Sequence, residues 1–136
     1  AFDIITSGHV SFFQALRRQA AKQTKTNTAC ILVAVNSDSS VRRLKPGRPI
    51  NTLADRMAVL DGLKHVDGVC SFAETTPLNI VKFVKPDILA KGGDWAEDTI
   101  IGAKFVKSRG GQVWVIPYKS GYSTTGIIER IQNRKG

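Results

Sequence analysis

The sequence is poor in cysteine and in long apolar runs, and both shortages narrow the class of protein. Its two cysteines, Cys30 and Cys70, lie inside apolar, strand-like runs. The longest apolar run covers only residues 29–35, far short of the roughly 20 residues that a membrane-spanning helix needs. The N-terminus shows no charged start followed by an apolar segment and a small-residue cleavage site. We therefore expect a cytoplasmic protein with two reduced, buried thiols and no membrane partner.

Acidic residues are missing between Asp3 and Asp38, so the N-terminal third is strongly basic. The whole chain has 20 lysines and arginines against 11 acidic residues, a formal charge of +9. Such a charge permits binding to nucleic acid, to an anionic surface or to phosphate-bearing substrates, or it forms a solvated basic face. We find no zinc-ligand spacing or aromatic-rich motif that favours nucleic acid. The basic residues of this region are Arg17, Arg18, Lys22, Lys25, Arg42, Arg43, Lys45 and Arg48.

Strand-like and helix-like segments alternate along the chain, and the composition suits one domain spanning residues 1–136. Apolar strands joined by helices predict an α/β fold, with a parallel sheet covered by helices on both faces. The expected strands are 29–36, 68–72, 88–91 and 112–116. The expected helices are 8–23, one capped by Asn51 or Thr52, one beginning at Pro77, and those at 99–109 and 124–134.

The ligand crevice of such a sheet lies beyond the carboxyl ends of its strands and at helix N-termini. The first candidate there is Thr6-Ser7-Gly8-His9, which opens a helix whose first turn contains no acidic residue. Its free amides can receive phosphate oxygens, and His9 adds a donor and, if protonated, a charge. The alternative is an ordinary helix cap formed by Thr6 or Ser7.

Two further candidates combine hydroxyl or basic side chains with a position next to a helix or strand. Ser123, Thr124 and Thr125 open the last helix, where they either bind an anion or act as an N-cap. Asn36 and Asp38 follow a strand and precede the basic segment 42–49, which is too rich in proline and glycine to be helical. This segment is either a mobile lid that closes on phosphates or a solvated loop.

Arg56 stands inside the apolar stripe of its helix, between Leu60 and Leu63 on the helical wheel. Its guanidinium either extends to solvent or binds a ligand phosphate. The last candidate, residues 91–95, follows a strand with paired glycines that allow a ligand to approach the backbone closely, and Trp95 can cover a base. A plain turn is the alternative.

Five segments, read in order, resemble the cytidylyltransferase-like nucleotidyltransferases: FDIITSGHV, VAVNSDSSVRRLK, GRPINTLADRMAVL, LAKGGDW and GYSTTGIIERI. Within that family the likeness is greatest to adenylyltransferases that make ADP-heptose for bacterial lipopolysaccharide. It implies a Rossmann-like three-layer α/β/α sandwich that binds ATP with Mg²⁺ and a sugar 1-phosphate, and in which dimers are common. The family's usual first strand has no counterpart in this sequence, so we expect a longer natural chain.

The resemblance assigns roles to individual residues. Heptose-type members usually carry histidine where Thr6 stands, whereas phosphopantetheine adenylyltransferases carry threonine, as here. Asp3 or Asp38 is a candidate magnesium ligand. The implied catalytic residues are His9, Lys45 and Arg56. The implied nucleotide-binding residues are Phe2, Asp3, Thr6, Gly8, His9, Asn36, Asp38, Lys91, Gly92, Gly93, Asp94, Ser123, Thr124 and Thr125.

The reaction that the resemblance implies is transfer of AMP from ATP to D-glycero-D-manno-heptose 1-phosphate, with release of pyrophosphate. The acceptor oxygen is already anionic at neutral pH, so no general base is required. Two alternatives stay open within the family: a cytidylyltransferase of the glycerol-3-phosphate type and a nucleotide-binding module with weakened catalysis. A basic protein that binds nucleic acid is a third alternative, which we disfavour.

Overall fold

Four short strands run parallel in two pairs, and helices connect them. In this computed structural model the described residues are 2–24, 26, 28–93, 95–117 and 124–134. The N-terminal half contains α1 (Ser7–Ala21), β1 (Leu32–Asn36), α2 (Asp38–Leu44), α3 (Leu53–Asp61) and β2 (Gly68–Phe72). The C-terminal half contains α4 (Leu78–Val84), β3 (Ile88–Gly92), the 3₁₀ turn η1 (Glu97–Thr99), α5 (Ala103–Ser108), β4 (Gln112–Ile116) and α6 (Thr124–Asn133).

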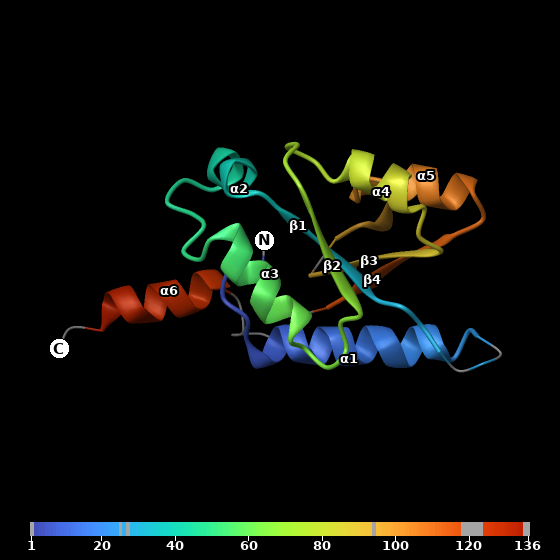
Figure 1. Cartoon of the computed structure of the whole chain (residues 1–136), viewed down its shortest axis with the longest axis horizontal. Helices are drawn as coiled ribbons and strands as arrows, with labels where there is room; N and C mark the ends of the chain where they lie inside the picture. The colour runs from blue at the N-terminus through green and yellow to red at the C-terminus, as the bar shows by residue number, and fades with distance from the viewer. Residues whose placement is uncertain (1, 25, 27, 94, 118–123, 135–136) are drawn as a thin grey trace.

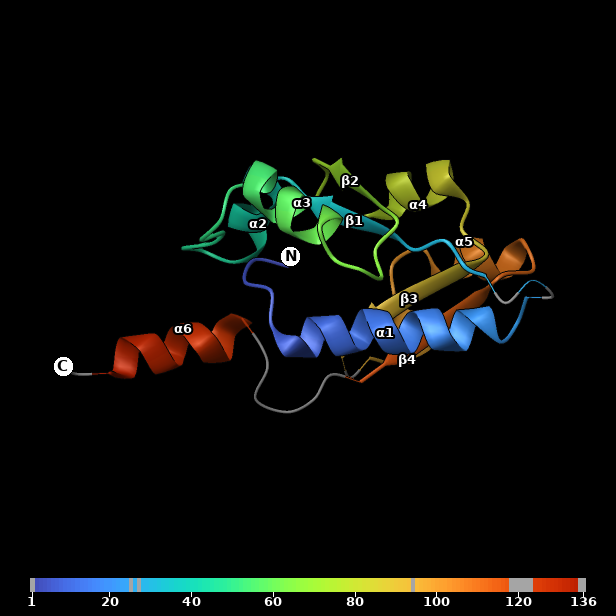
Figure 2. The same cartoon turned by 60° about the horizontal axis from the view of Figure 1, so that its bottom comes forward.

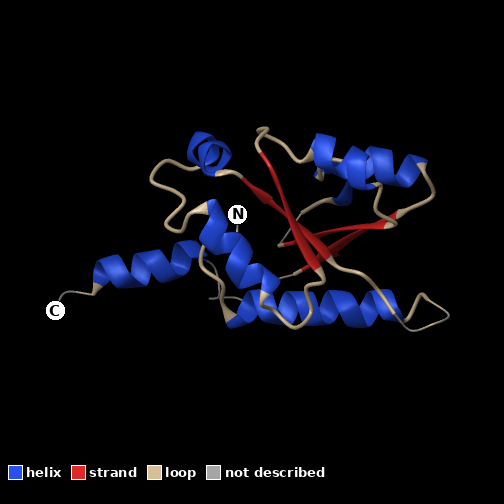
Figure 3. Ribbon diagram, viewed as in Figure 1, coloured by secondary structure: helices blue, strands red, loops and turns tan. Residues whose placement is uncertain are grey.

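The strand pairs form two separate sheets. β1 pairs with β2 from Leu32 opposite Gly68 onward, and β3 pairs with β4 from Ile88 opposite Gln112 onward. Every pair is parallel, as strands joined through helices must be. The α/β class with parallel strands is confirmed, but the single continuous sheet is not, because the described strands form two two-stranded sheets. The two pairs cross one another in Figure 1 and Figure 3.

Side chains, rather than backbone hydrogen bonds, connect the two sheets. Val33 and Val35 of β1 belong to the same buried cluster as Ile116 of β4, Phe13 of α1 and Leu60 of α3. Each such side chain stabilises the fold by about 1.5–3 kcal/mol when fully buried. This cluster fixes α1 and α3 against the strands. The ends of β1 and α1, where candidate site residues lie, are therefore held by one core.

A second cluster packs α4 and α5 against the other strand pair. It contains Val81 of α4, Ala103 and Val106 of α5, and Val113 of β4. Figure 1 shows α4 and α5 lying together on the side of the strands opposite α1. Helices therefore cover the strands on two sides, as the layered architecture predicts. Helix α6 extends away from the strands in Figure 1 and in Figure 2.

Several local expectations need correction. Arg42 and Arg43 are helical residues of α2, and the proline-rich loop begins only at Lys45. The helix expected at 99–109 is interrupted, because Gly102 has φ 93° between η1 and α5. The thiols are not both buried, since Cys30 is exposed and Cys70 is half-buried.

β1 begins at Leu32 and not at residue 29 as expected. The backbone N–H of Ile31, just before it, bonds to a side chain and not to a neighbouring strand. The backbone N–H of Ile31 donates to Oδ2 of Asp67 at 2.7 Å, and the same oxygen accepts from Arg17 of α1 at 2.6 Å. Arg17 also donates to the carbonyl oxygens of Ala29 and His65. These bonds tie the last part of α1 to the start of both β1 and β2. Within the described ranges, no helix is both long enough and apolar enough to span a membrane.

Candidate active site

The Thr6–His9 turn caps α1 through its own side chains. The Oγ1 atom of Thr6 accepts from the N–H of Gly8 at 3.2 Å, and Nδ1 of His9 accepts from the N–H of Thr6 at 3.1 Å. The two side chains also lie 3.2 Å apart. Such reciprocal capping satisfies backbone donors that a helix start leaves without partners. The cap alternative for this turn is confirmed, and phosphate binding by the same turn stays a prediction.

His9 is a buried, neutral histidine. His9 is only 8% exposed. The centroid of its ring lies 5.6 Å from that of Phe2, and the Phe2 ring stacks on Phe13. Burial lowers the pKa of His9 from the ordinary value of 6.5 because desolvation disfavours the imidazolium. Since Nδ1 accepts a backbone hydrogen bond, Nε2 carries the proton of the neutral ring. His9 therefore offers a neutral N–H donor rather than a charge.

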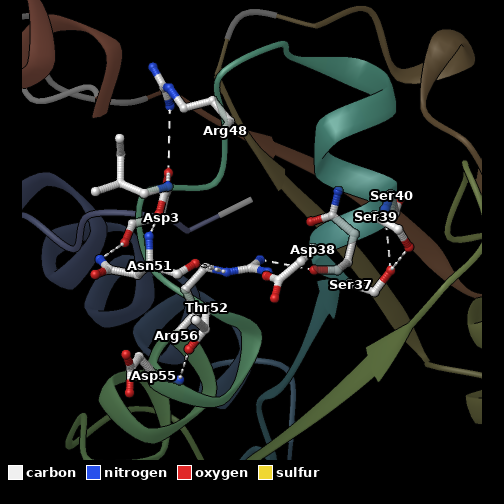
Figure 4. A network of polar contacts seen from close by, with 12 residues as sticks. Asp3, Ser37, Asp38, Ser39, Ser40, Arg48, Asn51, Thr52, Asp55 and Arg56 are labelled. Carbon is white, nitrogen blue, oxygen red and sulfur yellow. Dashed lines mark hydrogen bonds and ion pairs between the residues drawn. The ribbon is translucent and has the colours of Figure 1, made fainter.

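Asp3 holds the loop that follows α2. Its side chain is almost completely buried, and its two oxygens accept the backbone N–H groups of Ile50 at 2.7 Å and Asn51 at 2.8 Å. The side-chain amide of Asn51 donates back to the carbonyl oxygen of Asp3 at 2.7 Å. This double connection fixes residues 50–51, which precede the Thr52 cap of α3, against the segment just before the Thr6–His9 turn (Figure 4).

Arg48 links the same loop to α6. Its Nη2 atom donates to Oγ1 of Thr125 at 3.0 Å, across 77 positions of sequence. Its Nη1 atom lies 3.9 Å from Oδ2 of Asp3, as Figure 4 shows. Three segments that are far apart in sequence therefore meet: the chain before α1, the loop after α2 and the first turn of α6.

Arg56 lies at the centre of a buried set of polar contacts. Its side chain is 0% exposed and lies 2.7 Å from Oδ1 of Asp38, whose side chain is 34% exposed. Its Nη1 donates to the carbonyl oxygen of Asn36 at 2.9 Å, and its Nε donates to that of Asn51 at 3.1 Å. The alternative that the Arg56 guanidinium extends to solvent is wrong, because its side chain is completely buried. The partners are protein groups at the carboxyl end of β1, so a direct contact with phosphate stays a prediction.

Lys45 is an exposed residue at the end of α2. It is the C-cap of α2, and its side chain makes no hydrogen bond or ion pair with any described residue. Asn36 and Asp38 are half-buried at the end of β1 and the start of α2. Of the three catalytic residues predicted from the sequence, Lys45 is thus the one whose charge reaches solvent.

The loop after β3 folds its tryptophan back over the strand. The ammonium of Lys91 lies 3.9 Å from the centre of the Trp95 ring, and burial lowers the pKa of Lys91. Gly93 has φ 121°, and a Cβ there would lie 2.8 Å from Nε1 of Trp95. Glycine is therefore required at this position by both backbone conformation and space. Asp94 lies outside the described residues.

Printed polar contacts join five predicted site residues, Asp3, Asn36, Asp38, Arg56 and Thr125, into one network. Between described residues, no hydrogen bond or ion pair joins the Lys91–Trp95 loop to Asp3, Arg48 or Arg56. Ser123 and the side chain of Thr124 lie outside the described part of the chain. A shallow pocket of about 160 Å³ is lined by Val10, Phe13 and His65 among others, and it contains none of the predicted residues.

The contact of Arg48 with Thr125 was not predicted from the sequence. The segment 42–49 indicated either a basic lid that closes on phosphates or a solvated loop, but it did not single out Arg48 from the three other basic residues of that stretch. The available signal was local: Arg48 lies between Gly47, which has φ 80°, and Pro49. Glycine allows the left-handed conformation at residue 47, and Pro49 restricts the backbone of Arg48, which precedes it.

The arrangement suits an anionic ligand that is bound by donors rather than attacked by a nucleophile. The network contains the guanidinium groups of Arg48 and Arg56 and the hydroxyl of Thr125, and the carboxylates of Asp3 and Asp38 in it already accept hydrogen bonds. Within the described ranges, no cluster of three metal-ligating side chains occurs. Both oxygens of Asp3 accept backbone hydrogen bonds, so Asp3 does not suit a metal ion. Asp38 uses Oδ1 for Arg56 and is the better carboxylate for one.

Comparison with known proteins places this chain among nucleotidyltransferases. The family model described as cytidylyltransferase-like matches residues 1–130. The protein named "Bifunctional protein HldE" from Azotobacter vinelandii (strain DJ / ATCC BAA-1303) is 47% identical over 134 residues, which are 98% of this chain and 27% of that protein. Its namesake from Pseudomonas fluorescens (strain Pf0-1) is 48% identical over 132 residues, 96% of this chain and 26% of that protein. The chain thus spans about a quarter of the length of these curated relatives.

A solved structure shows the same fold. The crystal structure of the lipopolysaccharide core biosynthesis protein from Thermoplasma volcanium GSS1 superposes with a TM-score of 0.60 at 27% sequence identity. The match covers 88% of this chain and 90% of that chain. It confirms the Rossmann-like architecture that the family resemblance implies. The family match, the relatives and the fold agree with the site geometry, and the chain belongs to the cytidylyltransferase-like family of nucleotidyltransferases.

Proposed function

We propose that this protein transfers AMP from ATP to D-glycero-D-manno-heptose 1-phosphate and releases pyrophosphate. The observation that carries the proposal is the contact of Arg48 with Thr125, together with the bonds from Asp3 to Ile50 and Asn51. These contacts bring the Thr6–His9 turn, the basic loop and the start of α6 to one place. The relatives named HldE and the lipopolysaccharide core biosynthesis protein support a sugar phosphate acceptor in lipopolysaccharide precursor synthesis.

In the proposed step, an oxygen of the sugar 1-phosphate forms a bond to the α-phosphorus of ATP. The bond between that phosphorus and the oxygen bridging to the β-phosphate breaks, and pyrophosphate leaves with the electron pair. Because the attacking oxygen is already anionic, the protein must align two negatively charged groups and neutralise the charge that develops. It need not remove a proton.

The site residues divide into donors that face the ligand and residues that hold them. His9 supplies a neutral N–H, and Lys45 supplies a mobile positive charge. Preorganised donors of this kind stabilise charge more in the transition state than in the bound substrate. The buried position of Arg56 favours a positioning role: it fixes Asn36, Asp38 and Asn51 rather than contacting phosphate itself.

Mg²⁺ fits the site through one carboxylate. This ion commonly keeps several waters and binds through one or two carboxylates together with substrate phosphates. Asp38, with Oδ2 unused by Arg56 and a side chain 34% exposed, is the residue that would hold it. When bound, the ion would neutralise part of the triphosphate charge. Asp3, Phe2 and Gly8 are then proposed to shape the turn rather than to bind metal.

The remaining assignments follow from the proposed substrates. The Lys91–Trp95 loop is proposed to bind the nucleoside, and Thr124 and Thr125 are proposed to bind the triphosphate. ATP and a sugar phosphate are metabolites of the cytoplasm, where we place the protein, and binding to nucleic acid is not expected. A homodimer stays a prediction from the family resemblance.

The test is a measurement of pyrophosphate release with pairs of substrates. ATP with D-glycero-D-manno-heptose 1-phosphate is expected to give the highest kcat/KM. Equal or better turnover of CTP with glycerol 3-phosphate would replace the proposal by the cytidylyltransferase alternative. Binding of ATP without turnover of any sugar 1-phosphate would indicate a nucleotide-binding module.

A further inference from the structure

Arg48 carries a charge that its surroundings do not balance. Its side chain is only 14% exposed, and the carboxylate of Asp3 is its ion-pair partner at 3.9 Å. That separation is longer than the donor–acceptor distance of about 2.7–2.9 Å for a charge-assisted hydrogen bond. Both Asp3 oxygens accept backbone N–H groups at 2.7 and 2.8 Å instead. The carboxylate is thus oriented toward the backbone of residues 50–51 and not toward the guanidinium.

The hydrogen bonds of the guanidinium are also incomplete. A guanidinium has five N–H donors, and among the described residues the Arg48 side chain makes one hydrogen bond, to the neutral hydroxyl of Thr125 at 3.0 Å. No described side-chain nitrogen is both fully buried and without a hydrogen-bond partner, so the unbonded nitrogens of Arg48 are accessible, where a ligand can reach them. Arg56, by comparison, uses its donors on a carboxylate and two carbonyl oxygens.

We propose that Arg48 is a phosphate-binding residue for the triphosphate of ATP, and this rests on the proposed function. The planar fork of arginine matches two oxygens of one phosphate group, and phosphate supplies the anionic acceptors that Asp3 does not. Arg48 already contacts Thr125, which the family resemblance assigns to the triphosphate. The substrate would therefore supply the close anionic partner that Arg48 does not have among the described residues.

The opposing explanation is that Arg48 is only a structural link between the loop and α6. Such a link would affect binding of a small inorganic anion only by moving α6, and a displaced α6 would also lower the unfolding temperature. Inorganic pyrophosphate, read together with thermal unfolding, is therefore the discriminating probe. It carries the phosphate chemistry of ATP without the nucleoside, so the Lys91–Trp95 loop does not contribute to its binding.

The experiment compares Arg48→Gln, Arg48→Lys and Arg42→Gln with the wild-type protein. Titration calorimetry with ATP and with inorganic pyrophosphate gives Kd, and thermal unfolding reports on the fold. Arg42 is the matched control because it is an exposed arginine of α2 that the site does not use. Arg42→Gln therefore shows how much the Kd changes when the protein simply loses one positive charge.

We expect Arg48→Gln to weaken both ATP and pyrophosphate binding by about tenfold or more, because a charge-assisted hydrogen bond of this type is lost. Arg48→Lys should fall between Arg48→Gln and the wild type, since it keeps the charge and loses the fork. Arg42→Gln should change either Kd by less than about threefold, as expected for an exposed charge. The KM for the sugar phosphate should stay near its wild-type value in all three.

Unchanged pyrophosphate binding in a folded Arg48→Gln protein would overturn the proposal, and so would an equal loss in Arg42→Gln. If Arg48→Gln does not fold, Arg48→Lys decides in the same way: weaker binding of both probes supports the proposal, and wild-type binding overturns it. Failure of the proposed function is seen separately, as wild-type protein that binds ATP and pyrophosphate but releases no pyrophosphate from any substrate pair.

Discussion

The guanidinium of Arg56 is completely buried, whereas the carboxylate of Asp38, 2.7 Å away, is 34% exposed. The pair therefore sits at the border of the core, with the cation inside and the anion facing the site. Removing the cation leaves the carbonyl oxygens of Asn36 and Asn51 without their donor. We expect Arg56→Met to lower the free energy of unfolding by about 3–5 kcal/mol, as for other broken buried pairs. Equilibrium unfolding in urea measures this free energy for the variant and for the wild-type protein.

Arg42→Met is the control for this prediction because Arg42 lies exposed on α2. Its effect should stay within about 0.5 kcal/mol, as for most surface substitutions. If Arg56→Met is as mild as Arg42→Met, the contacts of Arg56 contribute little to the free energy of unfolding. If stability falls as expected, kcat of Arg56→Met must be measured without urea and at a temperature below the Tm of the variant, where it is still folded.

Most elements of the fold were predictable because their signals are local. The strands at 68–72 and 112–116 coincide with β2 and β4, since short apolar runs bounded by polar residues and glycine mark buried strands. Thr52 was a candidate cap and is the N-cap of α3. The segment 42–49 was assigned wrongly as a whole, because Pro46, Gly47 and Pro49 dominate its composition although α2 continues to Leu44.

Features that depend on distant parts of the chain were beyond this reasoning. The wheel position of Arg56 placed it in the apolar stripe of its helix, but its partners come from β1 and α2 and are set by packing. The contact of Arg48 with Thr125 spans 77 positions, and no periodicity or cap relates them. The division into two sheets likewise depends on how Val33, Val35 and Ile116 pack together, which strand propensity does not determine.

His9 is expected to be needed for turnover. If its Nε2–H donates to phosphate in the transition state, His9→Ala should lower kcat by about 10²- to 10³-fold, with a much smaller change in ATP affinity. Because His9 also caps α1 and packs on Phe2, stability should fall by about 1 kcal/mol as well. Steady-state kinetics and thermal unfolding of the same variant separate the two effects.

His65→Ala is the matched control, since the side chain of His65 lines the shallow pocket outside the polar network. Near-normal kcat in His9→Ala would reduce the Thr6–His9 turn to a cap. The lowered pKa of His9 adds a second check: the ring is already neutral at pH 7, so kcat should not fall as the pH rises from 6.5 to 8. A loss of kcat over that range would indicate that the imidazolium is the active form.

Asp67 should make the protein sensitive to acid. Its pKa is lowered from 3.8, first by the N–H of Ile31 and then by Arg17. A carboxylate with a lowered pKa contributes stability above its unfolded value and loses it as the pH falls through the folded value. Asp67→Asn should therefore be less stable than wild type at pH 7, and the difference should shrink below pH 3.8. Asp61→Asn, an exposed carboxylate at the end of α3, should show no such trend.

Gly93 tests the nucleoside loop, because its backbone and its contact with Trp95 both exclude a side chain. It has φ 121°, and an added Cβ would lie 2.8 Å from Nε1 and 3.2 Å from Cδ1 of Trp95. Gly110 has φ 81° with nothing within 4 Å of an added Cβ, so Gly110→Ala carries the backbone cost alone, about 1–2 kcal/mol. Gly93→Ala carries that cost and must also displace the indole from Lys91.

We therefore expect both alanine variants to unfold at lower temperature, but only Gly93→Ala to raise the KM for ATP and to change the tryptophan emission. The KM for ATP should rise because the proposed base-covering ring has moved, while the KM for the sugar phosphate should not. Trp95→Leu in the Gly93→Ala background removes the clash with the indole. The tryptophan emission of this double variant should therefore equal that of the single Trp95→Leu variant. If Gly93→Ala keeps the wild-type KM for ATP while its emission changes, Trp95 moves without affecting the nucleotide, and the loop after β3 does not bind the nucleoside.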